Sequence, residues 1–291
     1  MAGKDPELDK PTGVMTTGHE WDGIRELNNP LPRWWLWTFY ATIFWALVYA
    51  IAYPAWPLIS QATQGLLGHD QRIEVAEEMT AADQAREVYR AQIASMDLQE
   101  VQNDPELARF AMGSGAATFR TYCAQCHGAG AQGHPGYPNL LDDAWLWGGD
   151  LDAIQTTITH GIRSPDDDDT RIGDMLAFGR DGLLERPDIA AVVEHVLSLS
   201  GQDHDPELAE TGATVFADNC ATCHGEDGTG LRELGAPNLT DAIWLYGGDR
   251  ATITETVVNG RSGMMPNWSP RLTEEQIKEV ALYVHSLGGG E

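Results

Sequence analysis

The sequence is poor in cysteine and in positive charge. Four of its 291 residues are cysteines, too few for a small fold held together by disulfide bonds. Its 18 lysines and arginines face 44 acidic residues, which gives a formal net charge of −26. Such a chain repels a phosphate backbone, so nucleic acid is excluded as a partner. The composition, 42% hydrophobic and 21% charged, excludes a disordered polyelectrolyte and a many-pass membrane protein, and the length favours about two compact domains with additional segments.

Charge is absent from one long stretch, residues 34–59, which reads WWLWTFYATIFWALVYAIAYPAWPLI. At about 1.5 Å per residue, a helix of this length exceeds a hydrocarbon core about 30 Å thick. Tryptophan and tyrosine at both ends are typical of membrane interfaces. A cleaved signal peptide is disfavoured because a long polar segment precedes the run, and a buried core helix is the alternative. The stretch therefore predicts a transmembrane helix in contact with the lipid bilayer.

The orientation of this helix follows from the basic residues around it. They precede the apolar run, and the next one after it is Arg72. The preceding ones are Lys4, Lys10, Arg25 and Arg33. The positive-inside rule predicts a cytoplasmic N-terminus and an exported remainder.

The remainder contains an internal repeat. The tetrapeptide DPEL occurs at 104–107 and at 205–208, and the similarity continues to the C-terminus. Before it, residues 71–103 are rich in Ala, Glu and Gln, and Thr80 and Asp83 have the spacing of a helix capping box. We expect a cytoplasmic segment (1–33), a transmembrane helix (34–59), a periplasmic helical linker (60–103) and two tandem modules (104–201 and 202–291).

The modules are expected to be helical. In the first copy we predict helices around 106–122, 151–159 and 186–199, each with a counterpart in the second copy. Little of the sequence alternates with a period of two, so strands are not expected. Gly115 with Phe119, and Gly212 with Phe216, suit a close crossing between the first and last helices.

All four cysteines lie in two C-x-x-C-H motifs, CAQCH at 123–127 and CATCH at 220–224. On one helical turn, two thiols can reach the two vinyl groups of a haem, and the next imidazole points at the iron. A zinc site, a redox dithiol or two short disulfides do not require a histidine after each second cysteine. The motifs predict two covalently bound haem c groups on Cys123, Cys126, Cys220 and Cys223, with His127 and His224 as iron ligands.

The opposite axial ligands are sought among the methionines. Met175 in copy one and Met265 in copy two come into register when the copies are aligned, and Met264 is the neighbour of the latter. Both methionines can also be flexible core residues. His134, His160 and His195 leave open a bis-histidine iron in copy one.

Two arginines follow repeated glycines. Arg163 comes after Gly161 and Arg261 after Gly260, and each is a candidate partner for a haem propionate or a solvent-facing residue. The acidic loop 166–169 occurs only in copy one and is either solvated or a dock for a cation or a basic protein.

The sequence resembles the membrane-anchored dihaem cytochrome c subunit, the CcoP or FixP family (subunit III), of cbb-type haem-copper cytochrome c oxidases. The resemblance rests on TGH at 17–19, WDGI at 21–24 and ELNNPLPRWW at 26–35. It continues through residues 139–140, 145–149, 158–163 and 263–268.

This resemblance implies a mainly α fold with one N-terminal transmembrane helix followed by two tandem class I-like cytochrome c domains. It also implies that the chain spans the inner membrane of a bacterium once, with its N-terminus in the cytoplasm and its haem domains in the periplasm. It also implies that the subunit accepts electrons from donor cytochromes c. It passes them through a monohaem cytochrome c subunit to the oxygen-reducing catalytic subunit in aerobic or microaerobic respiration, where proton transport belongs to the complex. The implied iron ligands are His127, Met175, His224 and Met265. One departure is Leu176, where the family commonly has proline.

The chain by itself is expected to be a non-catalytic redox subunit. One membrane helix cannot enclose a haem and a copper ion, and the histidines are not clustered as copper ligands. A dihaem peroxidase, or a dihaem subunit of another membrane dehydrogenase, is the alternative. The acidic exported surface is expected to steer basic donor cytochromes.

Overall fold

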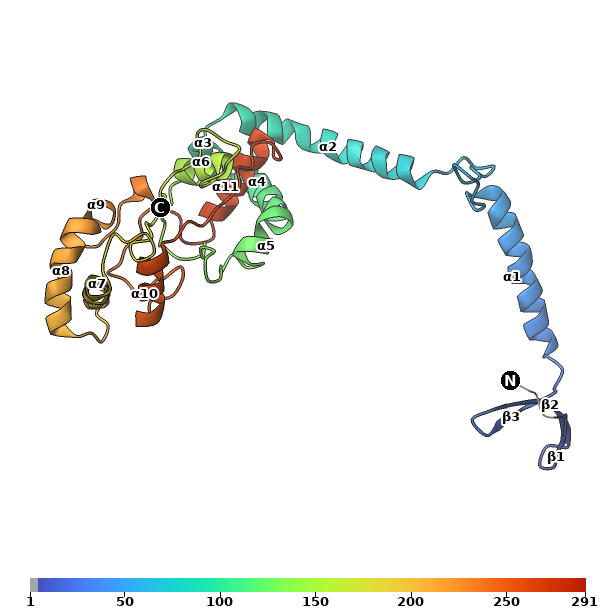
Figure 1. Cartoon of the computed structure of the whole chain (residues 1–291). Helices are drawn as coiled ribbons and strands as arrows, with labels where there is room; N and C mark the ends of the chain where they lie inside the picture. Colours follow the sequence, from blue (N-terminus) through green and yellow to red (C-terminus); the bar gives the residue numbers. More distant parts are fainter. Residues whose placement is uncertain (1–4) are drawn as a thin grey trace. The chain divides into compact units, whose positions relative to one another are not determined.

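The computed structural model describes residues 5–291, so Lys4 and the start of the predicted 1–33 segment lie outside the described residues. The chain divides into two units, the first ending at Asp83 and the second running from Gln84 to Glu291. The first unit holds the three strands and helix α1, and the division falls inside helix α2 (Figure 1). Each unit is described by itself.

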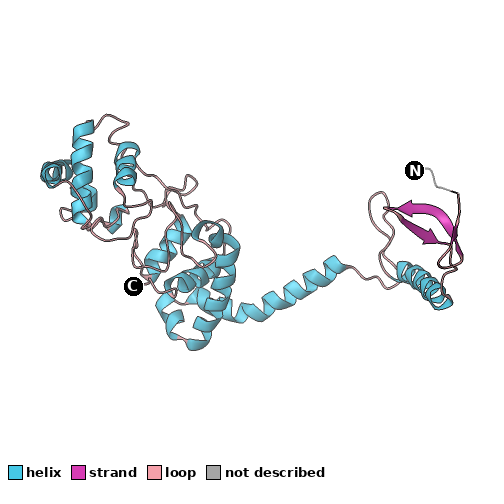
Figure 2. Cartoon of the chain, turned by 90° about the horizontal axis from the view of Figure 1, so that it is seen from below, coloured by secondary structure: helices cyan, strands magenta, loops and turns pink. Residues whose placement is uncertain are grey.

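The first unit begins with a small antiparallel sheet, which the sequence did not predict (Figure 2). Its strands are β1 (Leu8–Asp9), β2 (Val14–Trp21) and β3 (Ile24–Leu27). The turn between β2 and β3 is Asp22-Gly23, with φ of +48° and +85°, the Asp-Gly pair that favours a two-residue hairpin. The apolar alternation used to predict strands is missing here because the buried positions of β2 are Thr16 and Gly18.

Helix α1 (Arg33–Ala52) is the predicted membrane span, but it ends before the predicted boundary at residue 59. Pro54 follows its end closely, and a proline disfavours helical backbone at the residue before it. The loop beyond returns to the helix, where the Leu66 and Leu67 amides donate to the carbonyls of Ile51 and Ala52 at 2.9 and 3.0 Å. The 20 residues of α1 are unburied and, apart from Arg33, uncharged, and at about 1.5 Å each they match a hydrocarbon core about 30 Å thick.

The predicted helical linker consists of α2 (Gln71–Ser95) and α3 (Leu98–Asn103). The predicted capping box at Thr80 is wrong, because Thr80 lies inside α2 and its hydroxyl donates to the Ala76 carbonyl. The capping box in this region is Asp97 with Glu100, at the start of α3. Tertiary contacts explain the difference. Ile93, Leu98 and Val101 are buried in the core of the second unit, so the chain has to turn between α2 and α3.

The second unit is helical, as predicted, and among its described residues regular strands are absent apart from isolated bridges. Copy one forms α4 (Pro105–Thr118), a π-helical turn (Phe119–Cys123), α5 (Ala124–His127), α6 (Leu151–His160) and α7 (Arg186–Leu199). Copy two forms α8 (Pro206–Asn219), α9 (Ala221–His224), a 3-10 turn (Arg232–Leu234), α10 (Arg250–Asn259) and α11 (Glu274–His285).

The two copies exchange their last helices. One hydrophobic core combines α4 and α6 of copy one with Trp268, Leu272 and α11 of copy two. The other combines α7 and Phe178 of copy one with α8 and α10 of copy two. Figure 1 shows α11 beside α4 and α7 beside α8. The sequence repeats and the packed cores therefore do not coincide.

The predicted close helix crossings are present, with exchanged partners. A Cβ added to Gly115 of α4 would overlap the backbone carbonyl of Glu279 in α11. One added to Gly212 of α8 would overlap that of Ala191 in α7. Phe119 and Phe216 are among the largest fully buried side chains and fill the two joints.

One buried carboxylate joins α7, α8 and α10. Glu194 accepts hydrogen bonds from Arg250 Nε and Nη2 at 2.6 and 3.0 Å and from the Asp205 amide at 2.8 Å. The hydrogen bonds from Arg250, the largest cause, hold the pKa of Glu194 below its usual value, and burial opposes them. We expect Glu194→Gln to lower the free energy of unfolding at pH 7 by about 1–3 kcal/mol, because it removes the charge from these hydrogen bonds.

The sign of the pH dependence follows from the lowered pKa of Glu194. Its stabilisation is present above the unfolded-state pKa, about 4.3, and is lost as pH falls through the folded-state pKa. Denaturant unfolding of the wild type and of Glu194→Gln, at pH 7 and at low pH, measures this dependence. The difference between their free energies of unfolding should shrink in acid. Glu210→Gln, on the exposed face of α8, is the charge-matched control. An equal effect of both substitutions would contradict the assignment.

Candidate haem-binding sites

The two C-x-x-C-H motifs adopt the same local structure. Each forms a four-residue helix that begins after the first cysteine, α5 after Cys123 and α9 after Cys220. Each helix ends at its histidine, and the next residue is a glycine with positive φ. None of the four cysteines, all of which lie in the described part of the chain, is in a disulfide, and burial, the main cause, raises the pKa of the Cys123 and Cys220 thiols to about 11. Both motifs thus present two thiols and an imidazole from one short helical segment.

The ring of each motif histidine is fixed by a prolyl carbonyl. His127 Nδ1 lies 3.0 Å from the Pro138 carbonyl oxygen, and His224 Nδ1 lies 3.0 Å from that of Pro237. A carbonyl only accepts, so Nδ1 carries the proton and Nε2 keeps its lone pair for a metal. Burial lowers the pKa of both histidines, which favours this neutral form. The haem motifs alone did not predict this role, although the repeated Pro-Asn-Leu at 138–140 and 237–239 carries the signal.

Beside the second motif lies a cavity of about 420 Å³. Cys220, Cys223 and His224 line one part of it, and Met175 is part of the lining as well. Apolar side chains of α7, α8 and α10 supply much of the remaining wall: Val192, Val196, Phe216, Ile253 and Val257. The cavity fits a covalently bound haem, because its volume is in the range of cofactor pockets and its wall is apolar. It also offers two thiols, an imidazole with a free Nε2 and a thioether.

The methionines lie crosswise with respect to the repeats. Met175 belongs to copy one but packs against the core that holds Cys220. Met265 belongs to copy two but packs against the same core as Cys123. Trp268, three residues after Met265, contacts Tyr122, the residue before Cys123, with ring centroids 5.6 Å apart. The pairing of each methionine with the motif of its own copy, which the sequence alignment suggested, is not what the structure brings together.

Backbone hydrogen bonds hold both methionine loops. Ile162 and Met265 exchange amide-to-carbonyl bonds of 2.9 and 3.0 Å, and Met175 and Arg261 exchange two of 3.1 Å. Gly161 and Gly260 precede these pairs, and a Cβ at either would overlap the carbonyl of the paired methionine. The structural counterpart of Arg261 is therefore Ile162, so Arg163 and Arg261 are not equivalent residues.

The two arginines predicted as propionate partners both line the second cavity. Arg261 lies with its guanidinium carbon 4.3 Å from the Tyr246 ring centroid, and its Nε donates to Thr256 at 3.0 Å. Arg163 Nε donates to the Gly263 carbonyl at 2.6 Å.

The three alternative histidine ligands have other neighbours. His134 stacks on Tyr137 with centroids 4.5 Å apart, and the His195 ring packs against Phe216 at 5.2 Å. His160 Nδ1 lies 3.1 Å from Asp167 of the acidic loop. None of the three is among the described residues that line the second cavity.

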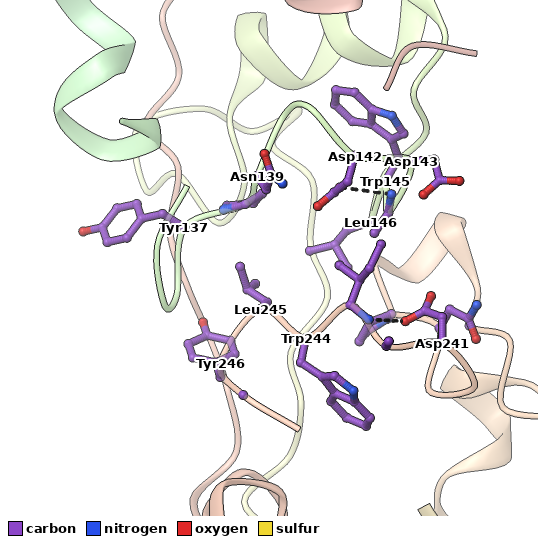
Figure 3. A pocket seen from close by; sticks show the side chains of 18 of the residues that line it. Tyr137, Asn139, Asp142, Asp143, Trp145, Leu146, Asp241, Trp244, Leu245 and Tyr246 are labelled. Carbon is purple, nitrogen blue, oxygen red and sulfur yellow. Dashed lines mark hydrogen bonds between the residues drawn. The ribbon is translucent and has the colours of Figure 1, made fainter. Parts of the chain in front are cut away.

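The loops that follow the two motifs meet at a cleft of about 620 Å³ (Figure 3). Corresponding residues of the two copies line it together, among them Trp145 and Leu146 from one and Trp244 and Leu245 from the other. A direct backbone bond of 2.8 Å runs from the Gly136 amide to the Leu245 carbonyl. The two motif regions are thus in contact through their loops, which the sequence did not indicate.

Comparison with known proteins assigns both parts of the chain. A family model described as the N-terminal domain of cytochrome oxidase-cbb3, FixP, matches residues 13–60. A second, described as cytochrome C oxidase, cbb3-type, subunit III, matches residues 110–196 and 207–284. The chain is similar to the cbb3-type oxidase subunit CcoP of Cereibacter sphaeroides (61% identity over 98% of this chain and 99% of the relative). It is also similar to the subunit FixP of Azorhizobium caulinodans (55%, 98% and 96%) and of Rhizobium meliloti (51%, 100% and 100%).

These matches confirm several predictions. The chain has a mainly helical fold with one apolar N-terminal helix and two tandem cytochrome c domains. Domains of this kind transfer electrons and carry c-type haem on their paired cysteines, so the predicted function class and cofactor are confirmed. The apolar helix fits a single-pass membrane anchor. The chain belongs to the CcoP/FixP family, subunit III of cbb3-type cytochrome c oxidases.

Proposed function

We propose that this chain accepts electrons from donor cytochromes c and relays them through two haems toward the oxygen-reducing subunit of a cbb3-type oxidase. A monohaem cytochrome c subunit is the proposed intermediate carrier. The observation that carries this proposal is the duplicated site, in which each motif histidine has a free Nε2 and a methionine of the other copy packs in the same core. A haem iron that binds both a histidine and a methionine, in addition to the four porphyrin nitrogens, is suited to electron transfer, because no position is free for a substrate.

The proposed ligand sets cross the sequence repeats. Cys123 and Cys126 hold the first haem, with His127 and Met265 as axial ligands. Cys220 and Cys223 hold the second, with His224 and Met175. Core packing of each methionine supports the sets. Arg163 and Arg261 remain the proposed propionate partners, now both at the second haem, since both line its cavity.

The proposed topology has the N-terminal sheet in the cytoplasm and both haem domains in the periplasm. The basic residues before α1 support it, because positive charge favours the cytoplasmic side. The unburied side chains of α1 are proposed to pack against lipid and helices of the other oxidase subunits. Purifying the complex through a tag at Glu291 tests these partners: haem b and copper-dependent oxygen uptake should accompany the c-type haem, and their absence would contradict the proposal.

Substituting the methionines tests the crossed ligand sets. In a background with Cys220 and Cys223 both replaced by serine, only the first haem remains. There we expect Met265→His to lower the reduction potential, because a thioether favours ferrous iron more than an imidazole does. Met175→His, the matched control, should leave that potential unchanged. A redox titration in which Met175→His lowers the potential and Met265→His does not would support pairing within each copy instead.

A further inference from the structure

Arg163 contacts the loops that carry both methionines. We propose that Arg163 is a positioning residue that clamps the two axial-ligand loops together, so that one side chain sets the geometry of both haem irons. This inference rests on the proposed ligand sets. In this role the guanidinium holds the two loops at a fixed spacing, which a residue that only pairs with a haem propionate would not have to do.

The clamp consists of hydrogen bonds to two backbone carbonyls. Arg163 Nε donates to Gly263 at 2.6 Å, and Nη2 donates to the same oxygen. Nη1 donates to the carbonyl of Gly173. Gly263 lies two residues before Met265, and Gly173 lies two residues before Met175. The planar guanidinium fixes the directions of its donors, so it also fixes the spacing of the two loops.

The backbone around Arg163 leaves the side chain little freedom. Its amide donates to Arg171 at 2.9 Å, and the preceding residue, Ile162, pairs with Met265. Its φ is +51°, a left-handed value that is uncommon for a residue with a side chain. Such a conformation persists where the surroundings determine it, and it is frequent at ligand clamps. The side chain is 21% exposed.

The loop that carries Met175 is also confined. A Cβ on Gly173 would overlap the Leu234 carbonyl, so this loop is in close contact with copy two. Asp174 lies 3.7 Å from Arg163 Nε and accepts a hydrogen bond of 2.7 Å from Ser262. Without the guanidinium, two partly buried carbonyls lose their donors, and of these side-chain links only the hydrogen bond from Ser262 to Asp174 still joins the loops.

Two substitutions at Arg163 separate a clamp from a simple charge effect. Arg163→Asn suits the left-handed backbone but is too short to reach both carbonyls. Arg163→Lys keeps the charge but lacks the fixed fork. In the full chain we expect both variants to admit carbon monoxide to both ferrous haems, where the wild type admits it to neither. Both reduction potentials should fall, more in Arg163→Asn than in Arg163→Lys.

The matched control is Arg261→Gln, which removes the same charge from the same cavity. The Arg261 side chain contacts Thr256 and Tyr246, both in copy two. It should change only the second haem. Carbon monoxide binding by one haem only in the Arg163 variants, or by neither, would overturn the clamp. If instead Met175→His and Met265→His shift no potential, the ligand sets themselves fail, which is a separate result.

Discussion

Val280→Asp is expected to abolish the first haem site, although Val280 lies in the second sequence copy. Val280 is fully buried in α11, in the core that α11 forms with α4 and α6. An unpaired carboxylate in an apolar core costs several kcal/mol, a large part of the about 5–15 kcal/mol that stabilises a typical domain. Without that core, Cys123 and Cys126 lose the structure that presents them to a haem.

Val192→Asp in α7 is the matched substitution. Val192 occupies the position of Val280 in the repeat and is 1% exposed in the other core. It should cost the second haem, although it lies in the first copy. Mass spectrometry of peptides containing each cysteine pair measures which haem is missing. If each substitution removes the haem of its own copy, the exchanged helix packing is wrong.

The haem motifs could be predicted from the sequence because their geometry is local. Cys123, Cys126 and His127 lie within five residues, and a single helical turn sets their directions. The exchange of α7 and α11 could not be predicted in the same way. Both helices carry similar apolar faces, AVVEHVLSLSG and VALYVHSLGG, and such a face is compatible with either core.

Polar side chains distinguish α7 from α11, and their contacts support the exchange of these helices between the two cores. In α7, Glu194 binds Arg250 of α10, whereas the corresponding residue of α11 is Leu282. In α11, Lys278 Nζ donates to the carbonyls of Ala94 and Met96, at 3.0 and 2.9 Å, near the end of α2. These contacts join residues distant in the sequence, so they become visible only in three dimensions. We infer that they specify which helix enters which core.

The N-terminal sheet and the end of α1 show a different limit of the sequence interpretation. An apolar pattern locates a strand only where one face is buried in a hydrophobic core, but β2 buries Thr16 and a glycine. The Asp22-Gly23 turn was the available signal. For α1, uncharged composition alone extended the prediction to residue 59, while Pro54 gave the better estimate of the helix end.

Gly115→Ala is expected to destabilise the first haem domain, while Gly113→Ala on the same helix is not. Alanine in a helix is favoured over glycine by about 0.5–1 kcal/mol, and Gly113 has open space where its Cβ would lie. At Gly115 the added Cβ would overlap the Glu279 carbonyl and lie 2.9 Å from Tyr283 Cβ. Helices α4 and α11 must then separate, and overpacking of this kind costs about 1–3 kcal/mol or more.

The two substitutions therefore differ in the sign of their effect on the free energy of unfolding, although each adds one methyl group to α4. Denaturant unfolding followed at the absorbance of the first haem, in the background lacking Cys220 and Cys223, measures both. Gly212→Ala should act on the second haem in the same manner, because its Cβ would overlap the Ala191 carbonyl of α7. Equal stability of Gly113→Ala and Gly115→Ala would mean that α11 does not cross α4 at this glycine. Since α11 belongs to copy two, a loss confined to Gly115→Ala also places a helix of the second repeat in the core of the first haem.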